Sequence, residues 1–242
     1  MTPIVILSPH LDDAVLSCWR RLTGPGDVQV INVFAGVPAA GRTSWWDRTG
    51  GATDSAQRMR ERIEEDRVAL SLAGRCATNL AFLDDQYRCS QRELSAIIEA
   101  LRTELPADAH VYAPAALGAH PDHVVVREAT LSMRGDGAKI SLYADLPHAS
   151  ARGWPPWVSN AARNAAEVGH RWVAELAQTG IPPDDMRPTV HTLTRSEHVH
   201  KQTAVQAYAT QLKPLETQFG RPIADRSLLG YEVEWELPRP GT

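Results

Sequence analysis

The stretch Pro3-Ile-Val-Ile-Leu-Ser8 runs directly into Pro9-His-Leu-Asp-Asp13, and together they decide the fold. A continuous apolar run of this length, without polar alternation, is typical of a β-strand that is buried on both faces. Such strands belong to sheets that are covered by helices on both sides, and ligands bind there beyond the carboxyl ends of the strands. The polar stretch therefore follows the strand at the place where a functional site is expected.

Outward from this stretch, apolar strand-like segments alternate with helical segments of about 10–19 residues. We expect strands at 3–8, 28–34, 79–83, 110–113 and 139–144, and helices at 13–22, 55–73, 93–104 and 124–133. This alternation predicts right-handed crossovers and an α/β fold, with a Rossmann-like, mostly parallel sheet sandwiched by helices. Residues 145–242, with a helix near 159–178 and another around 194–212, are interpreted as an elaboration, so that residues 1–242 form one domain.

The composition is that of an ordinary globular protein, with 242 residues of which 43% are hydrophobic and 22% are charged. The formal net charge of −4 argues against a nucleic-acid partner, which would require a basic surface. We expect no transmembrane segment and no secretory leader, because no apolar run approaches the roughly 18 residues that span a bilayer. The three cysteines, Cys18, Cys76 and Cys89, lack Cys-x-x-Cys spacing and are expected to be reduced, packed thiols in a cytoplasmic protein.

A second polar stretch, His120-Pro-Asp-His123, follows the expected strand at 110–113. Helix capping by a carboxylate explains either stretch alone about as well as chemistry does. Capping does not explain why histidines and aspartates from two distant stretches gather at one edge of the sheet. The two stretches together therefore favour a functional site.

Imidazole nitrogens and carboxylate oxygens are suitable ligands for zinc and related divalent ions. His10 and Asp13 are three residues apart across a strand-to-helix turn, so both can face one point, and a histidine of the second stretch would supply a third ligand. Three protein ligands leave a coordination position for water, as in catalytic zinc sites. A carboxylate that is not a ligand can then act as the general base, and a free histidine can stabilise the developing charge.

With these motifs, the sequence resembles the PIG-L-type (LmbE-like) zinc-dependent N-deacetylases, whose motifs are usually written Ala-His-Pro-Asp-Asp-Glu and His-Pro-Asp-His. Trp46-Asp-Arg48 and Arg62-Ile-Glu-Glu-Asp66 are similar to further features of that family. Two positions depart from its first motif, since Leu11 replaces proline and Ala14 replaces glutamate. Neither position carries a metal ligand, so the site is expected to survive these changes.

The resemblance implies roles for particular residues. It makes His10, Asp13 and His123 the ligands of Zn²⁺, although Fe²⁺ or another divalent ion would also suit such a site. It makes Asp12 the general base and His120 the group that stabilises the oxyanion or acts as an acid. Asp122 would orient a histidine from behind.

The activity implied is zinc-dependent hydrolysis of an N-acetyl or similar N-acyl amide on a glucosamine-type sugar, within a small conjugate that is the expected partner. An amidase of a thiol–sugar conjugate is the alternative within the same chemistry. A non-catalytic metal-binding module on the same fold is the alternative outside it. The acceptor sugar, the native metal and the oligomeric state are left open.

Other residues fall in the loops around the expected site. Polar substrate contacts are assigned to Arg62, Asp84 and Asp145, with His148 beside them, but a helix cap or an exposed charge explains each about as well. The tryptophans Trp45, Trp46, Trp154 and Trp157 either stack on a substrate or anchor their loops. Helical spacing favours packing for Lys201, Tyr208 and Gln211, and solvent exposure for His198 and His200.

Overall fold

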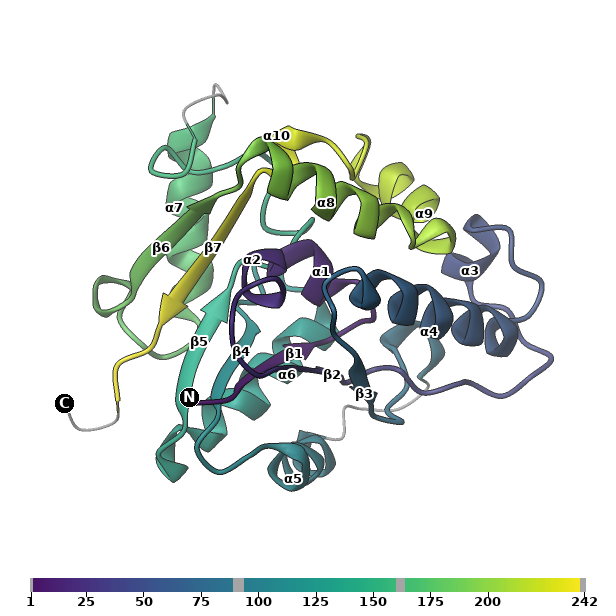
Figure 1. The fold of residues 1–242 in the computed structure, drawn as a ribbon, viewed down its shortest axis with the longest axis horizontal. Helices are drawn as coiled ribbons and strands as arrows, with labels where there is room; N and C mark the ends of the chain where they lie inside the picture. Colours follow the sequence, from purple (N-terminus) through teal and green to yellow (C-terminus); the bar gives the residue numbers. More distant parts are fainter. Residues whose placement is uncertain (1, 89–93, 160–163, 240–242) are drawn as a thin grey trace.

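The fold is built on one seven-stranded sheet, seen in a computed structural model that describes residues 2–88, 94–159 and 164–239 (Figure 1). The strands are β1 (Ile4–Ser8), β2 (Val28–Asn32), β3 (Ala77–Asn79), β4 (His110–Pro114), β5 (Lys139–Tyr143), β6 (Arg187–Thr192) and β7 (Tyr231–Glu236). Their order is β3-β2-β1-β4-β5-β7-β6, and the first five are parallel. The predicted α/β fold with a mostly parallel sheet is confirmed.

Helices cover both faces of this sheet (Figure 1). The longer ones are α4 (Ser55–Ser71), α5 (Leu94–Glu104), α6 (Pro121–Ser132), α7 (Ala165–Ala177), α8 (Arg195–Gln206) and α9 (Ala209–Phe219). The short helices are α1 (Asp13–Ser17), α2 (Trp19–Leu22), α3 (Trp45–Thr49) and α10 (Arg226–Leu229). In one layer α4 packs against α8 and α9, and α1 against α8, whereas α5 and α6 pack together in the other. Because β1 lies between β2 and β4, the chain changes direction in the sheet beside the carboxyl end of β1.

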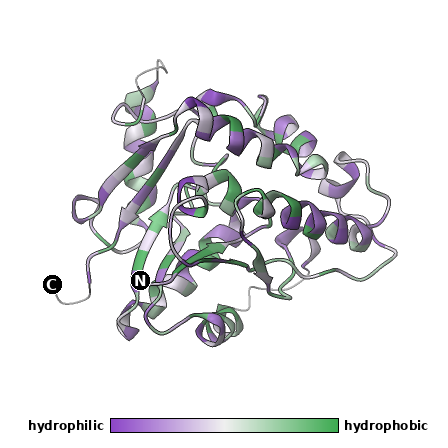
Figure 2. Ribbon diagram, in the orientation of Figure 1, coloured by the Kyte–Doolittle hydropathy of each residue, from purple (hydrophilic) through white to green (hydrophobic). Residues whose placement is uncertain are grey.

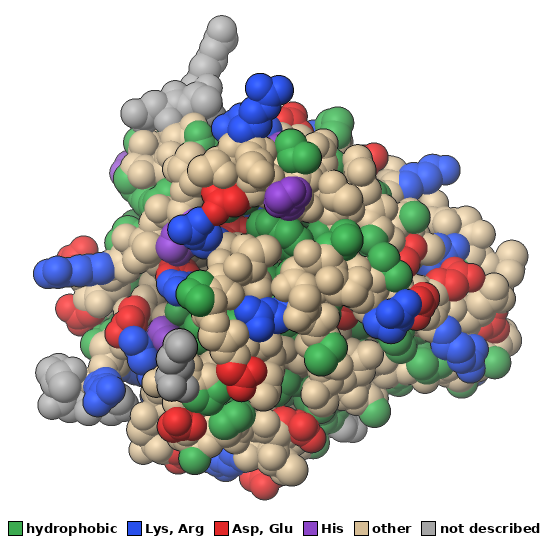
Figure 3. Space-filling view, in the orientation of Figure 1, with side chains coloured by type: hydrophobic (Ala, Val, Ile, Leu, Met, Phe, Trp, Pro, Cys, Tyr) green, Lys and Arg blue, Asp and Glu red, His purple; other side chains and the backbone are tan. Residues whose placement is uncertain are grey.

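The apolar strands form the core. Val5, Ile6 and Leu7 of β1 are fully buried, and β2 and β4 on either side are buried almost throughout. Figure 2 shows hydrophobic residues on the central strands, with hydrophilic residues along the outer sides of the helices. On the face shown in Figure 3, Lys and Arg side chains are interspersed with Asp and Glu side chains, so that face carries no extended basic surface.

Two strands at one end of the sheet, β7 and the edge strand β6, were not expected from the sequence. β7 pairs antiparallel with β5 and β6, and its sequence alternates glutamates with apolar residues. Glu232 and Glu234 are nevertheless buried, because Lys201 pairs with the first and Arg21 with the second. The partners lie far away in the sequence, so the pattern alone did not indicate a buried strand.

Several helix and strand boundaries also differ from those predicted. The helix expected at 13–22 is divided at Cys18, where Glu232 accepts hydrogen bonds from the backbone N–H groups of Trp19 and Arg20 and so begins α2. The helix expected around 194–212 is divided into α8 and α9 just before Ala209. The third strand ends at Asn79 instead of beginning there, and residues 45–49, expected as loop, form α3. Part of the helix expected near 159–178 lies outside the described residues.

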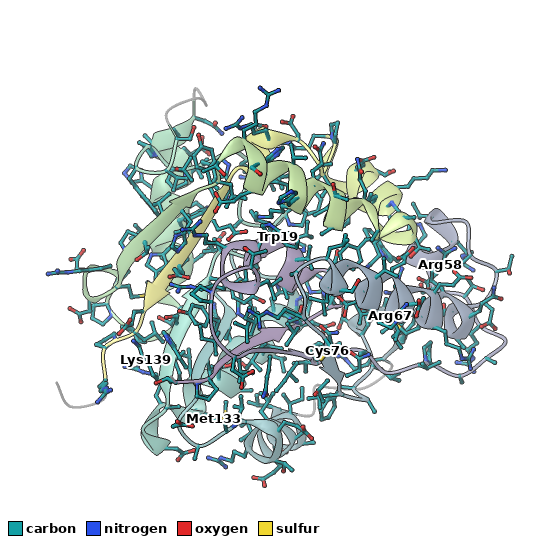
Figure 4. The ribbon with its side chains drawn as sticks, viewed as in Figure 1. Trp19, Arg58, Arg67, Cys76, Met133 and Lys139 are labelled. Atoms are coloured by element: carbon teal, nitrogen blue, oxygen red, sulfur yellow. The ribbon has the colours of Figure 1, made fainter. Side chains whose placement is uncertain are left out.

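α3 is held in place by α4. Arg58 of α4, labelled in Figure 4, donates a hydrogen bond to the carbonyl of Gly50, which follows α3. Buried Asp47 of α3 accepts from Ser55 at the start of α4 and pairs with Arg62 one turn beyond Arg58. These contacts fix the loop that carries Trp45 and Trp46.

The cysteines follow the expectation in part. Cys18 is buried and has a free thiol, but Cys76, which precedes β3 (Figure 4), is exposed and so is not the packed thiol predicted. Cys89 lies outside the described residues. Within the described ranges, no helix is both long and apolar enough to cross a membrane.

Candidate metal centre

The two polar stretches meet because β1 and β4 are neighbours in the sheet. In the first loop, the Ser8 hydroxyl donates to the carbonyl of His10 (2.6 Å) and accepts from the backbone N–H of Ala14 (3.0 Å), which folds residues 8–14 into a tight turn. In the second, His120 is the N-cap of α6 and Pro121 occupies its first turn. Leu11 and Ala14, the two residues that differ from the family motif, are both buried. Leu11 packs in a small cluster with Ala35 and Met59.

Three ligand-type atoms lie at nearly equal distances. His10 Nδ1 is 3.4 Å from Asp13 Oδ2, His123 Nε2 is 3.3 Å from the same oxygen, and the two nitrogens are 3.3 Å apart. Ligand atoms about 2.1 Å from a tetrahedral ion lie about 3.4 Å from one another. The donor set of His10, Asp13 and His123 therefore fits one face of a tetrahedral zinc-type site.

Buried carboxylates fix the orientation of both histidines. His10 Nε2 is 3.0 Å from Asp122 Oδ2, and His123 Nδ1 is 2.9 Å from Asp145 Oδ2. Because a carboxylate accepts, the hydrogen of each neutral imidazole belongs on the outer nitrogen, and the inner nitrogen then presents a lone pair. Three acceptor atoms then converge on one point, an arrangement that a cation stabilises. Ligand histidines of metal sites typically have such carboxylate partners.

The pKa shifts of His123, His10 and Asp13 also indicate that this cluster attracts positive charge. Burial lowers the pKa of His123, but the carboxylates of Asp13 and Asp145 outweigh it and raise the value to about 9. Burial likewise opposes charge on His10, yet Asp122 and Asp13 hold its pKa well above the usual range. For Asp13, burial raises the pKa, but the two histidines bring it well below normal. A divalent cation would take the place of the protons that these shifts attract.

Asp122 and Asp145 are both fully buried behind the ligand atoms. Asp122 is paired with Arg88 and accepts from the backbone N–H of Asp85 (2.9 Å), and Asp145 accepts from that of Leu117 (3.0 Å). Asp122 thus occupies the place expected for a carboxylate that orients a histidine. Asp145, for which the sequence predicts a substrate contact, instead supports His123 and is not among the residues that line the cavity. The substrate contact itself stays a prediction.

His120 lies beside the donor set without the same support. Its Nδ1 accepts from the backbone N–H of Asp122 at 3.3 Å, which leaves its hydrogen on Nε2. Burial, reinforced by His10, His123 and His148, lowers its pKa to about 2, so the ring is neutral at physiological pH. Ligand atoms of His10, His120 and His123 also lie within 4.8 Å of one another, and so do those of His10, Asp84 and Asp122. In the set of His10, Asp13 and His123 all three separations are 3.3–3.4 Å, and a carboxylate accompanies the two imidazoles.

A cavity of about 440 Å³ opens in front of the donor set. Asp12, only 7% exposed, lines it beside Asp13, and burial together with Asp13 raises the pKa of Asp12 to about 6. Of the predicted rim residues, Arg62, Asp84, His148, Trp45 and Trp46 line the cavity. Arg62 is held by Asp47 at 2.7 Å and by the hydroxyl of Tyr87 at 3.2 Å.

Other sequence-based assignments change. Trp154 and Trp157 pack around Trp172 away from this cavity, so they anchor their segment. Gln211, expected to pack, lines the cavity, and its Nε2 has no hydrogen-bond partner within the described part of the chain. His198 is 7% exposed and therefore buried, contrary to expectation, whereas His200 is exposed.

The supporting role of Asp145 leads to a direct prediction. Asp145→Asn is expected to weaken metal binding by about 10–100-fold, because the amide removes the charge that orients and polarises His123. Titration of the chelator-treated protein with Zn²⁺ against a chromophoric chelator measures this. Asp136→Asn, at an exposed carboxylate paired with Arg102, is the matched control. Equal affinities for the two variants would contradict the role.

Comparison with known proteins identifies the family to which this sequence is similar. The family model PIG-L, described as GlcNAc-PI de-N-acetylase, matches residues 5–134. The 2'-N-acetylparomamine deacetylase of Streptomyces fradiae is 30% identical over 171 residues, which cover 61% of this chain and 58% of that protein. The chain thus spans less than two thirds of that curated relative.

Several solved structures, two deacetylases among them, are similar over nearly the full length. The A40926 pseudoaglycone deacetylase Dbv21 has a TM-score of 0.72 at 27% identity, covering 100% of this chain and 99% of its own. The zinc-inhibited form of teicoplanin deacetylase Orf2 has a TM-score of 0.69 at 23% identity, covering 99% of both chains, and supports the fold alone. These relatives and neighbours are deacetylases, a class of hydrolases that act on N-acetyl amides.

Proposed function

Because the chain belongs to the PIG-L (GlcNAc-PI de-N-acetylase) family, we propose that it is a metal-dependent hydrolase that removes an N-acetyl group from a glucosamine-type sugar in a small glycoconjugate. The observation that carries the proposal is the compact donor set of His10, Asp13 and His123, with a free carboxylate and a neutral histidine beside it on one cavity wall. The single domain, residues 1–242, is part of the proposal, since β6 and β7 extend the same sheet.

His10, Asp13 and His123 would hold Zn²⁺ or a related divalent ion such as Fe²⁺. When bound, the ion supplies a Lewis acid that polarises the amide carbonyl and lowers the pKa of a water molecule toward about 7. The protein's own contribution is to keep both imidazoles in the correct tautomer through Asp122 and Asp145. These contacts fix the direction of both ligand nitrogens, whose lone pairs the ion would take in place of a proton.

Asp12 is the general base in this proposal. It adjoins the donor set without belonging to it, and its carboxylate faces the cavity in which the substrate amide would lie. A base is most effective when its pKa is near the working pH, and burial places the pKa of Asp12 at about 6. Asp12 would take a proton from the attacking water and return it to the leaving amine.

His120 stabilises the oxyanion as a neutral donor. Its Nδ1 already accepts a backbone hydrogen bond, so the Nε2–H group is available to the oxygen that becomes negative as water adds to the amide. Its low pKa argues against the second role that the family resemblance allows, that of a proton-donating imidazolium. The proton for the amine then comes from Asp12.

The rest of the cavity suits a sugar attached to a larger group. Arg62, Asp84 and Gln211 offer polar atoms near the donor set, as sugar hydroxyls require. Trp45, which is 70% exposed, and Trp46 form an aromatic wall at the mouth, which would stack on the sugar or on its aglycone. The similar proteins named above are deacetylases of 2'-N-acetylparomamine and of the A40926 pseudoaglycone.

The test is a mass-spectrometric screen of N-acetylglucosaminyl conjugates for loss of an acetyl group. Chelator-treated protein is compared with the same protein after addition of Zn²⁺ or Fe²⁺, and acetate is measured separately. We expect acetate release only in the metal-loaded samples. Preferential release of a larger acyl group would favour the amidase alternative, and stoichiometric metal binding without any turnover would favour the non-catalytic module.

A further inference from the structure

A buried network beneath the first loop is not used by the proposed reaction. The hydroxyl of Tyr208, between α8 and α9, is 2.7 Å from Asp66 Oδ1 of α4 and 3.1 Å from the carbonyl oxygen of Leu11. All three residues are at most 2% exposed. Both neighbours of the hydroxyl are acceptors, but a phenol carries one hydrogen. If Asp66 were ionised, one of these two buried acceptors would receive no hydrogen from Tyr208.

The second oxygen of Asp66 decides where an additional proton can lie. Asp66 Oδ2 is 2.7 Å from the amide nitrogen of Asn32, whose other hydrogen bond goes to Asn79 Oδ1 at 2.8 Å. Because this amide donates to Oδ2, that oxygen acts as an acceptor. The proton of a neutral Asp66 therefore lies on Oδ1 and points to Tyr208.

We propose that Asp66 is a protonated positioning residue, which donates to Tyr208 so that Tyr208 in turn donates to the carbonyl of Leu11. In this arrangement Asp66 Oδ2 accepts from Asn32, and the carbonyl oxygen of Leu11 accepts from Tyr208. The hydroxyl oxygen of Tyr208 accepts from Asp66, so none of these acceptors lacks a hydrogen. A buried polar group that lacks its partner is costly, so the neutral form is favoured inside the protein.

The surroundings of Asp66 support the neutral form. Burial, with the charge of Asp12 as a further cause, raises the pKa of Asp66 to about 7. Tyr208 faces it from the α8–α9 junction and Asp12 from the β1–α1 loop, whereas Asn32 and Asn79 on the strand side are uncharged. Among the described residues, the groups that act on Asp66 therefore include no cation that would stabilise its ionised form.

The network reaches two parts of the site without touching substrate. Leu11 lies between His10 and Asp12, so holding its carbonyl fixes the peptide that joins a ligand to the proposed base. The carbonyl of Tyr208 accepts from the backbone N–H of Gln211, which lines the cavity. The effect on turnover rests on the proposed function, whereas the proton count, the stability and the metal affinity do not.

Asp66→Asn and Asp66→Leu form a matched pair for the test. The amide of Asn can place NH₂ where the Oδ1–H group lies and C=O where Oδ2 accepts, so we expect parental metal affinity. Leu has similar size but no polar atom, and Tyr208→Phe removes the link to Leu11. Asp66→Leu and Tyr208→Phe are each expected to weaken Zn²⁺ binding by about tenfold, the equivalent of one buried hydrogen bond. Rescue by Asn but not by Leu is a result that a packing role would not produce.

The pH profile tests the proton itself. A carboxyl whose pKa is about 7 in the folded protein and 3.8 when unfolded contributes stability that is complete below about pH 4 and is lost as the pH rises through about 7. The Tm of the parent should therefore fall relative to that of Asp66→Asn between pH 5 and 9. Both chelator-treated proteins are to be unfolded thermally across this pH range. Asp12 titrates in both proteins, so its own contribution largely cancels.

Two outcomes would overturn the inference. If the Tm difference between the parent and Asp66→Asn stayed constant from pH 5 to 9, Asp66 would already be ionised at pH 5. An Asp66→Asn variant that binds Zn²⁺ as weakly as Asp66→Leu would show that the hydrogen-bonded chain does not position the loop. Both readouts are obtained without turnover, so failure of the proposed deacetylase activity would not be confused with either.

Discussion

Asp12→Asn is expected to lower kcat for acetyl release by about 10²–10⁴-fold while the protein keeps its metal, because this is the usual contribution of a positioned general base. Asn has the same shape, but its amide cannot accept a proton from water at neutral pH. Asp12 is absent from the compact donor set, so the affinity for Zn²⁺ should change little. Loss of turnover with retention of metal is the signature that separates a base from a ligand.

The measurement pairs single-turnover acetate release with metal analysis of the same samples. Asp108→Asn, at an exposed carboxyl, controls for the loss of one negative charge. If Asp12→Asn turned over like this control, Asp12 would not be the base. If it lost both metal and turnover, Asp12 would be a ligand instead.

The parental pH profile gives an independent check on the same assignment. Asp12 must be deprotonated to accept a proton, and burial followed by the charge of Asp13 raises its pKa to about 6. The rate should therefore fall as the pH decreases through about 6, or through a lower value with the metal bound, because a nearby cation favours the carboxylate. An acid limb well above pH 6 would assign the titration to another group.

The centre of the fold was predictable because its signals are local. The apolar run at 3–8 predicts a buried strand without knowledge of the neighbouring strands. The carboxyl end of such a strand is a recurrent position for ligands. His10 and Asp13 lie on one turn, so their proximity follows from sequence spacing alone. The meeting with His123 required only that β4 lie next to β1.

The parts that were not predictable depend on partners distant in the sequence. Asp145 is an ordinary loop aspartate until β5 places it beside the outer nitrogen of His123. Glu232 is acceptable inside β7 only because Lys201 and the start of α2 satisfy its oxygens. Asp66 belongs to a helix rich in charge, and its burial becomes visible only when Tyr208 and Asn32 are placed around it. Periodicity records which face of an element is apolar, but not which polar side chain will find a partner.

Asp13→Ala is expected to abolish metal binding, with a loss of affinity larger than the roughly 10–100-fold that follows from removing a supporting carboxylate. Asp13 Oδ2 is within 3.4 Å of both ligand nitrogens and also accepts from the backbone N–H of His10 at 2.8 Å. Its removal takes away the only anion of the donor set and an anchor of the loop. Two imidazoles then remain, which is one ligand fewer than catalytic zinc sites use.

Thermal unfolding with and without Zn²⁺ measures this loss, because a ligand present at 100 times its Kd stabilises the folded state by about 2.7 kcal/mol. The Tm of the parent should rise on addition of Zn²⁺, whereas that of Asp13→Ala should not. His120→Ala is the decisive comparison, since ligand atoms of His10, His120 and His123 also lie close together. If those three histidines held the ion, His120→Ala would lose the stabilisation by Zn²⁺ and Asp13→Ala would keep it, and both the ligand role of Asp13 and the oxyanion role of His120 would have to be abandoned.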